Sequence, residues 1–312
     1  MTTEIHKLVR IHGRQGAKQL QPQSAALIDI AANLLAEEST ETGYVYSGFC
    51  LTALPHKRLP DETPWERIAL SGRLKLTIIP GFLTSVSHAP QRVGVPYGAR
   101  ARLILLYLQS QAIKSQCPEI ELGRSMREWL GRMGLSIGGQ TYIDVRDQAR
   151  RLTACDLRFT WNDENGNDQF EKGSIVTRGT LSFHTGDDRQ GNLFPETVTL
   201  SAPFFKAIST HPVPLWEPAI KALANKSLAL DIYIWLAYRL HVLTKPTSVS
   251  WGSVFGQFGA GFSPSSIRRF RQFFKEALAM ALTVYEGARV EVTTDGLVLH
   301  PSRPPVAKLE RT

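Results

Sequence analysis

The sequence has little cysteine and no long hydrophobic run. Its three cysteines, Cys50, Cys117 and Cys155, stand far apart among 312 residues and form no CxxC pair. This excludes a disulfide framework and a zinc ribbon, and it indicates a reducing compartment. No stretch approaches the roughly 18 apolar residues of a membrane helix. The opening MTTEIHKLVRIHGRQG carries charge throughout and lacks the apolar core of a secretory signal. We therefore expect a cytoplasmic protein with no membrane partner.

Motifs of catalysis are also missing. There is no GxxxxGK[ST] phosphate loop and no GxSxG nucleophile motif, and the eight histidines form neither HxH nor HxxxH. The glycine-rich stretch at 256–262 precedes a helix but follows no strand, so we interpret it as a turn and not as a nucleotide site. His56 is interpreted as structural. The sequence thus predicts no enzyme, with no catalytic residue, no metal and no cofactor.

Positive charge is present in excess. Lys and Arg number 36 against 28 Asp and Glu, a net charge of +8, and 43% of the residues are hydrophobic, as in a globular chain with one or two cores. Residues 220–312 hold 12 basic and 6 acidic residues, so most of the excess lies in the last third. Such an excess favours a polyanionic partner. A basic surface that is only solvated is the alternative.

The first two thirds of the chain show an ordered series of elements. Residues 1–21 are polar and basic and are expected to be mobile, and a helix is expected at 24–38. The following pattern predicts three helices and then a hairpin, the order of a winged helix. The expected elements are strands at 44–54, 73–79 and 119–122, helices at 98–113, 125–134 and 140–154, and a hairpin of 156–161 with 174–185. Ser125 and Glu128 have the spacing of a capping box.

The same order recurs after a proline-rich segment, which we interpret as a linker containing one strand. Helices are expected at 227–243, 250–258 and 264–285, followed by a hairpin of 288–292 with 296–301 across the Asp295-Gly296 turn. The predicted fold class is therefore α+β, with two tandem winged-helix domains. The predicted boundaries are 1–43 for a polar segment plus helix, 44–190 for the first domain, 191–222 for the linker and 223–312 for the second domain.

The last long helix has two distinct faces. At 100° per residue its apolar positions form one stripe, and the opposite side is rich in hydrogen-bond donors. The third helix of a winged helix lies in the major groove, where Arg and Gln can contact guanine and adenine. The predicted DNA-binding residues of this domain are Ser265, Arg268, Arg269, Gln272 and Lys275 on the helix, with Arg289 and Arg303 at the hairpin. A solvated helix face that binds nothing is the alternative.

The corresponding helix of the first domain carries a similar but weaker pattern. Gln140 and Thr141 lie at its start, and Arg146, Arg150 and Arg151 lie on its polar side. Gln140 and the three arginines are predicted DNA contacts. Asp147 stands four residues before Arg151 and can pair with it. Contact with phosphate, an internally neutralised surface and a dimer interface all stay open for this helix.

Several long stretches resemble the plasmid-encoded RepA replication initiators. They are LPHKRLPDE (54–62), GVPYGARARLILLYLQSQA (94–112), EIELGRSMREWLGRMGL (119–135), RLTACDLRFTW (151–161), LANKSLALDIYIWLAYRLHVL (223–243), SWGSVFGQFG (250–259) and GLVLHPSRPPV (296–306). The resemblance implies an initiator that binds repeated sites, or iterons, in a plasmid origin and takes part in copy control. It further implies that the C-terminal domain makes the main specific contacts and that the N-terminal one aids DNA contact and dimerisation.

The expected partners are double-stranded origin DNA, a second copy of the chain, and the host initiator and replicative helicase. The resemblance implies monomers on the repeats in equilibrium with homodimers that repress the chain's own promoter. The leading hypothesis is a sequence-specific replication initiator that recruits host proteins. The first alternative is a dimeric transcriptional repressor without initiation activity. A nicking nuclease and a partner for acidic proteins are the others.

Overall fold

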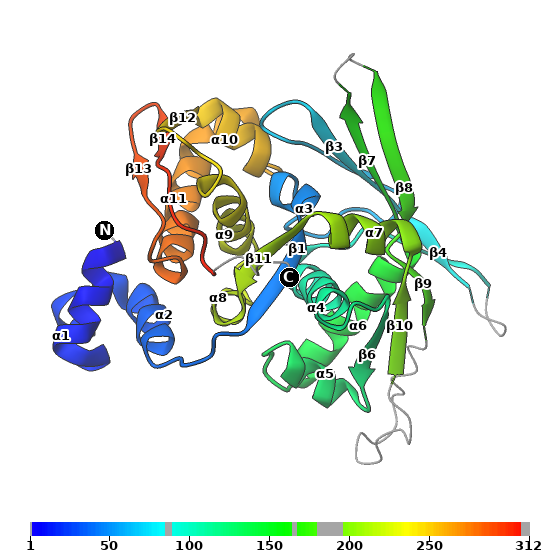
Figure 1. Cartoon of the computed structure of the whole chain (residues 1–312), viewed down its shortest axis with the longest axis horizontal. Coiled ribbons are helices and arrows are strands. Elements are labelled where there is room, and N and C mark those ends of the chain that lie inside the picture. Colours follow the sequence, from blue (N-terminus) through cyan, green and yellow to red (C-terminus); the bar gives the residue numbers. More distant parts are fainter. Residues whose placement is uncertain (1, 85–88, 164–166, 180–195, 307–312) are drawn as a thin grey trace. The chain divides into compact units, whose positions relative to one another are not determined.

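The structure is a computed structural model that describes residues 2–84, 89–163, 167–179 and 196–306 (Figure 1). It combines helices with several small sheets. The chain divides into two compact units: Met1–Gly43 with Val213–Thr312 form unit 1, and Tyr44–Pro212 form unit 2. Residues 1–43, expected as a separate segment, thus share a unit with the C-terminal residues. No described helix is long and apolar enough to cross a membrane.

Unit 1 begins with two helices, the first where residues 1–21 were expected to be mobile and the second within the helix predicted at 24–38. They are α1 (Thr2–Leu20), bent at Gly13 where φ is 65°, and α2 (Ala25–Leu35), joined by the short 3-10 helix η1 (Pro22–Ser24). Ile5 and Val9 of α1 are buried in one apolar cluster with Ile28 of α2. The expectation of mobility was wrong because an amphipathic stripe within the basic segment finds an apolar partner in α2.

The C-terminal part of unit 1 follows the predicted order of elements. Its members are α8 (Glu217–Ala222), α9 (Ser227–Leu240), β12 (Thr247–Ser250), α10 (Trp251–Phe258), the 3-10 helix η2 (Pro264–Ser266), α11 (Ile267–Val284), β13 (Val290–Val292) and β14 (Gly296–Leu299). The strand order is β12-β14-β13, all antiparallel. Buried Trp235, Phe258 and Phe274 pack ring against ring between α9, α10 and α11.

The predicted Asp-Gly hairpin is confirmed. Val292 pairs with Leu297 across the turn. A Cβ on Gly296 would lie 2.0 Å from Val249 O of β12, so only glycine allows this approach of β12 to β14. The close contact ties the hairpin to the strand that precedes α10.

Unit 2 is built around a four-stranded sheet and a buried helix. The sheet has the order β2-β3-β7-β8, and the strands are β2 (Trp65–Ile68), β3 (Leu74–Ile79), β7 (Asp156–Asn162) and β8 (Asp168–Ser174). The hairpin partner of β7 was predicted at 174–185, but it is β8, because Asn162 pairs directly with Asp168 and the turn is short. Of the predicted partner, residues 180–185 lie outside the described part.

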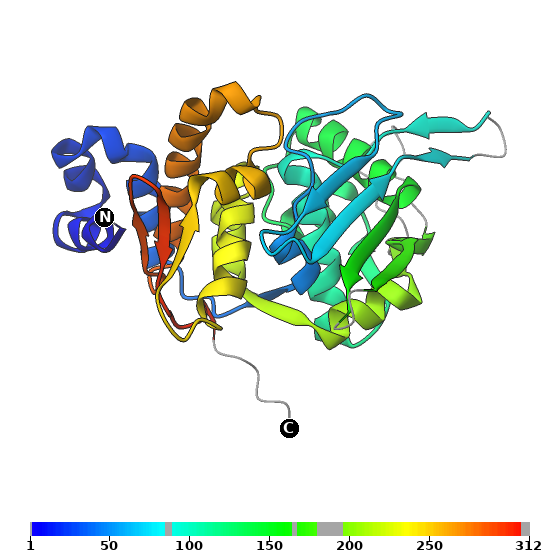
Figure 2. The ribbon, with the colours of Figure 1, turned by 90° about the horizontal axis from the view of Figure 1, so that it is seen from above.

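The remaining elements of unit 2 are helices and short strands, and in Figure 2 the helices lie behind the four-stranded sheet. They are α3 (Ser47–Leu51), β4 (Gly81–Leu83), β5 (Gln91–Val93), α4 (Gly98–Ser115), β6 (Glu119–Gly123), α5 (Met126–Arg132), α6 (Gly139–Ala154), β9 (Val176–Gly179), β10 (Glu196–Leu200) and α7 (Ala202–Thr210), with β1 (Thr42–Tyr46) and β11 (Pro212–Trp216) at the unit boundaries. The Ser125 hydroxyl accepts from Glu128 N, as the capping box predicts.

The predicted linker differs from the structure. The predicted linker contains β10, α7, β11 and α8, since Pro203 and Pro218 occupy first-turn positions of α7 and α8, where proline is well tolerated. The strand predicted at 119–122 is β6, which pairs with β10 and lies outside the sheet that holds the β7–β8 hairpin. Unit 2 therefore differs in strand pairing from the C-terminal part of unit 1.

Candidate nucleic-acid interface

The exposed face of α11 carries four of the predicted DNA-binding residues. Phe270, Phe274 and Leu278 form the buried stripe, as the 3.6-residue period predicts. The opposite side is exposed and includes Arg268, Arg269, Gln272 and Lys275, together with one acid, Glu276, which accepts from Gln272 at 3.2 Å. Among the described residues, no carboxylate forms an ion pair with these cations. The face is therefore donor-rich, and its three cations stay outside ion pairs within the described part of the chain.

Two of the cationic side chains of this face lie against aromatic rings. The Arg269 guanidinium lies 5.6 Å from the ring centre of Phe273, which is 45% exposed. Lys275 Nζ lies 5.7 Å from the ring centre of buried Trp251. Cations held against aromatic faces lose part of their mobility. Phe273 was missed by sequence reasoning because it sits at the edge of the apolar stripe, where a helical period does not decide exposure.

Ser265 lies just before α11 and not within it. It belongs to η2, and its hydroxyl is 2.9 Å from the Ser263 hydroxyl. Ser263 occupies the N-cap position of η2, but its side chain makes no capping hydrogen bond to the backbone. Ser265 therefore sits at the entrance to the basic face and remains exposed.

The hairpin flanks α11 and is held by Trp251. The Trp251 backbone N donates to Asp295 O at 2.9 Å, and its indole Nε1 donates to Thr293 O at 3.3 Å. The Arg271 guanidinium lies 5.4 Å from the same ring. One buried side chain thus connects the turn of the hairpin to the cationic helix.

The two predicted hairpin arginines are both exposed. Arg289 immediately precedes β13, and its backbone N donates to Ser302 Oγ at 3.1 Å. Arg303 follows β14, and its carbonyl accepts from Tyr285 Oη. His300 Nε2 lies 3.0 Å from Glu291 Oε1, so an acid already contacts this histidine. Backbone contacts therefore fix the base of both arginines while their guanidinium groups face solvent.

The polar side of α6 divides into exposed and buried residues. Gln140 is exposed and donates to Asp144 at 2.7 Å. Arg150 is exposed, Arg146 is partly exposed, and neither pairs with a carboxylate in the described part of the chain. The exposed stripe also includes Ile143, which is 62% exposed, an apolar residue that the charge pattern gave no reason to consider.

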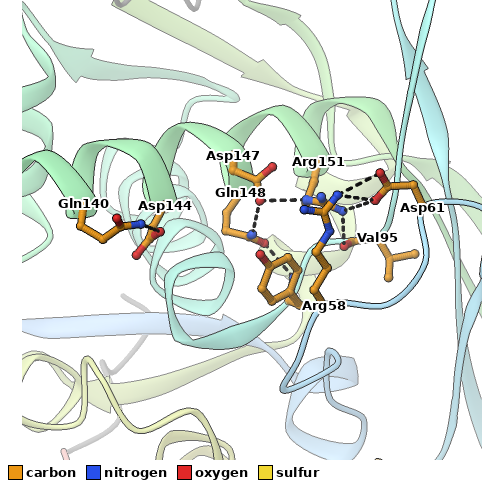
Figure 3. A network of polar contacts seen from close by, with 9 residues as sticks. Arg58, Asp61, Val95, Gln140, Asp144, Asp147, Gln148 and Arg151 are labelled. Carbon is orange, nitrogen blue, oxygen red and sulfur yellow. Dashed lines mark hydrogen bonds and ion pairs between the residues drawn. The ribbon is translucent and has the colours of Figure 1, made fainter.

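Arg151 is buried, which contradicts its predicted contact with DNA. Only 2% of the residue is exposed. Its Nη1 lies 3.1 Å from Asp61 and its Nε 2.9 Å from Asp147 (Figure 3). The guanidinium also lies 5.3 Å from the ring centre of Tyr97. The predicted pairing of Arg151 with Asp147 is confirmed. Because Asp61 of the 54–62 loop binds the same guanidinium and the residue is buried, Arg151 has no exposed N–H group for a phosphate.

A second buried arginine holds the same loop. Arg102 of α4 donates to Leu54 O at 2.6 Å, to Pro55 O at 3.1 Å and to Gly98 O at 2.8 Å. Its Nη2 lies 3.5 Å from His56 Nδ1, in keeping with a structural His56. The loop is therefore attached to α4 by Arg102 and to α6 by Arg151.

The remaining chemistry-bearing side chains have no site in the described residues. No group of three His, Cys, Asp or Glu that could hold a metal occurs there. Cys50 and Cys155 are fully buried and unpaired, and burial raises the pKa of Cys155 to about 12. A thiol with so high a pKa stays protonated, and hence weakly nucleophilic, at neutral pH.

Comparisons with known proteins agree with the mixed fold. The family model described as plasmid-encoded RepA protein matches residues 95–253. Crystallised selenomethionine derivatives of domains 2 and 3 of RctB are similar, with 11% identity and a TM-score of 0.53 over 84% of this chain and 100% of that one. A second structure of RctB domains 2 and 3 has 11% identity and a TM-score of 0.48 over 80% and 94%. The chain matches no curated protein. The similarity to the selenomethionine derivatives, with the TM-score of 0.53, shows a shared fold.

Proposed function

The chain belongs to the plasmid-encoded RepA family, and from this premise we propose that it is a replication initiator that binds repeated double-stranded sites in a plasmid origin. The observation that carries the proposal is the α11 face, where Arg268, Arg269, Gln272 and Lys275 are exposed and the three cations form no ion pair among the described residues, while Gln272 donates to Glu276 at 3.2 Å. Arginine and glutamine are the side chains suited to bidentate contacts with bases.

The C-terminal part of unit 1 is proposed to act as a winged helix. The strand β12 between the first two helices pairs with the hairpin that follows the third helix, and α11 is that third helix. In this arrangement α11 enters the major groove, and the β13–β14 wing contacts the flanking backbone. Arg289 and Arg303 are then phosphate contacts that orient the domain.

Unit 2 is proposed to assist binding and self-association. Gln140, Arg146 and Arg150 on the exposed side of α6 are its proposed DNA contacts. Homodimers in equilibrium with monomers, repression of the chain's own promoter, copy control and recruitment of the host initiator and helicase are proposed from family membership. None of these finer roles requires a catalytic residue in this chain.

The experiment that tests the function is selection of bound duplexes from a random library, followed by footprinting at two salt concentrations. We expect enriched sites in direct tandem, each occupied by one protein molecule. A single inverted repeat occupied by a dimer would instead indicate the repressor. Absence of enrichment at both salt concentrations would contradict sequence-specific binding altogether.

The Arg268→Ala variant is expected to weaken binding to the selected site by about 1–3 kcal/mol and to relax the preference at one base pair. The reason is the loss of donors that distinguish bases in the groove. Competition binding against duplexes varied at each position measures both effects. Arg10→Ala is the matched control, because this exposed arginine of α1 already contacts Glu286 at 3.4 Å. Equal weakening on selected and random duplexes would demote Arg268 to a phosphate contact.

A further inference from the structure

A two-stranded ribbon lies beside α6 in unit 2. In it, β4 and β5 pair Gly81 with Val93, Phe82 with Arg92 and Leu83 with Gln91. The ribbon projects from the rest of unit 2 (Figures 1 and 2). The major groove of a DNA duplex is wide enough to admit a two-stranded ribbon of this kind.

The ribbon is fixed to α6 at two points. A Cβ on Gly81 would lie 1.7 Å from Ala154 O, so only glycine allows β4 to approach the last turn of α6 this closely. On β5, Gln91 Oε1 accepts from Arg150 Nη2 at 3.4 Å. The ribbon and the exposed side of α6 therefore form one continuous surface.

This surface is positively charged. Residues 80–93 include no aspartate or glutamate. Arg92 is exposed, and its guanidinium lies 5.0 Å from the ring centre of Phe82, which is 53% exposed. In the described part of the chain, neither Arg92 nor Arg150 pairs with a carboxylate.

The acids of α6 form no ion pair with Arg92 or Arg150 among the described residues. Asp147 pairs with buried Arg151 at 2.9 Å, whereas Asp144 keeps its charge, since it accepts from the uncharged amide of Gln140 at 2.7 Å. Arg92 and Arg150 therefore keep guanidinium groups that an external anion can contact.

We propose that the β4–β5 ribbon is a second DNA-binding element, in which Arg92 and Arg150 contact the phosphate backbone of the duplex flanking the specific site. The inference rests on the proposed function and extends it. Stacking on Phe82 restricts Arg92 before binding, so less side-chain freedom is lost on contact with phosphate. Because phosphates carry no sequence information, the ribbon supplies affinity and register, and α11 supplies base preference.

The test is the double variant Arg92→Ala/Arg150→Ala in the full chain. We expect about three- to tenfold weaker binding to the selected site and to random duplexes alike. The slope of log K against log salt is expected to fall by about 2, one for each lost phosphate contact. A hydroxyl-radical footprint is expected to lose protection on one flank. The matched control is Lys172→Ala/Lys206→Ala, which removes two exposed cations of β8 and α7.

The outcomes separate this inference from the proposed function. If Arg268→Ala removes the base preference while the ribbon variant binds like the lysine control, the ribbon contact is overturned together with the proposed contact of Arg150, and sequence-specific binding by α11 stands. If the unaltered protein selects no sequence but the ribbon variant still lowers the salt slope on random duplexes, the ribbon contact is supported and the proposed function fails. A changed base preference in the ribbon variant would contradict a pure phosphate contact.

Discussion

Arg151→Ala is expected to lower the free energy of opening of α6 by about 3 kcal/mol, whereas Arg150→Ala is expected to change it by less than about 0.5 kcal/mol. The two arginines are neighbours in sequence, but Arg151 is buried against Asp61 and Asp147, and Arg150 is exposed. Removing Arg151 leaves two carboxylates without their cation and leaves a void beside Tyr97. Hydrogen exchange of peptides covering residues 139–154 in the full chain measures the difference.

The exposed arginine, Arg150, is expected to affect DNA binding and not the stability of α6. Arg150→Ala is expected to weaken DNA binding without changing exchange in α6, because its side chain supports no other residue of the core. Arg151→Lys is expected to destabilise the helix as well, since one ammonium group cannot replace a fork that reaches Asp61 and Asp147 at once. An Arg151→Ala protein with unaltered exchange protection and weaker DNA binding would show that the buried ion pairs do not hold α6.

The same ion pairs affect the titration of Asp61. Burial raises the pKa of Asp61. The hydrogen bond and charge of Arg151, together with those of Arg58, lower this pKa by more than burial raises it, so it lies below the ordinary value of 3.8. A lowered pKa in the folded protein stabilises the fold at pH values above the ordinary pKa, and this stabilisation is lost as the pH falls through the lowered value. In Arg151→Ala, the Asp61 pKa is expected to rise.

Sequence reasoning separates these two arginines only in part. The spacing of Asp147 and Arg151 is a local signal, and it correctly predicted their pairing. Asp61 lies 90 residues from Arg151 in the sequence, and no periodicity links the two. Burial of a charged residue therefore followed from a long-range contact that a single sequence does not show.

The other predictions likewise succeeded for contacts between residues close in sequence and failed for contacts between distant ones. The capping box at Ser125 and the hairpin turn at Asp295-Gly296 depend on residues within a few positions of each other, and both were predicted. The pairing of β6 with β10 and the folding of α1 onto α2 depend on partners elsewhere in the chain. Of the candidate interface, the exposed side of α11 was predictable, and the ribbon beside α6 was not.

Trp251→Ala is expected to have the largest effect in unit 1, lowering the free energy of unfolding by about 3–5 kcal/mol. Trp251 is 2% exposed, and its ring packs edge to face on Phe274 at 5.9 Å. Truncation removes this packing, the indole bond to Thr293 O and the surface under Arg271 and Lys275. Urea denaturation of the full chain measures the loss, and specific DNA binding is expected to decline with it.

Trp251→Phe distinguishes the ring from the indole N–H. A phenylalanine ring keeps most of the packing on Phe274 and most of the surface beneath the cations, but it cannot donate to Thr293 O. We expect a loss of only about 1 kcal/mol in the free energy of unfolding, the typical value of one hydrogen bond. The turn of the β13–β14 hairpin, no longer fixed by the indole, is expected to give weaker footprint protection at the flank, while the base preference proposed for Arg268 is expected to stay unchanged. If Trp251→Phe alters the base preference as strongly as the flank, then the indole N–H positions α11 itself and not the wing.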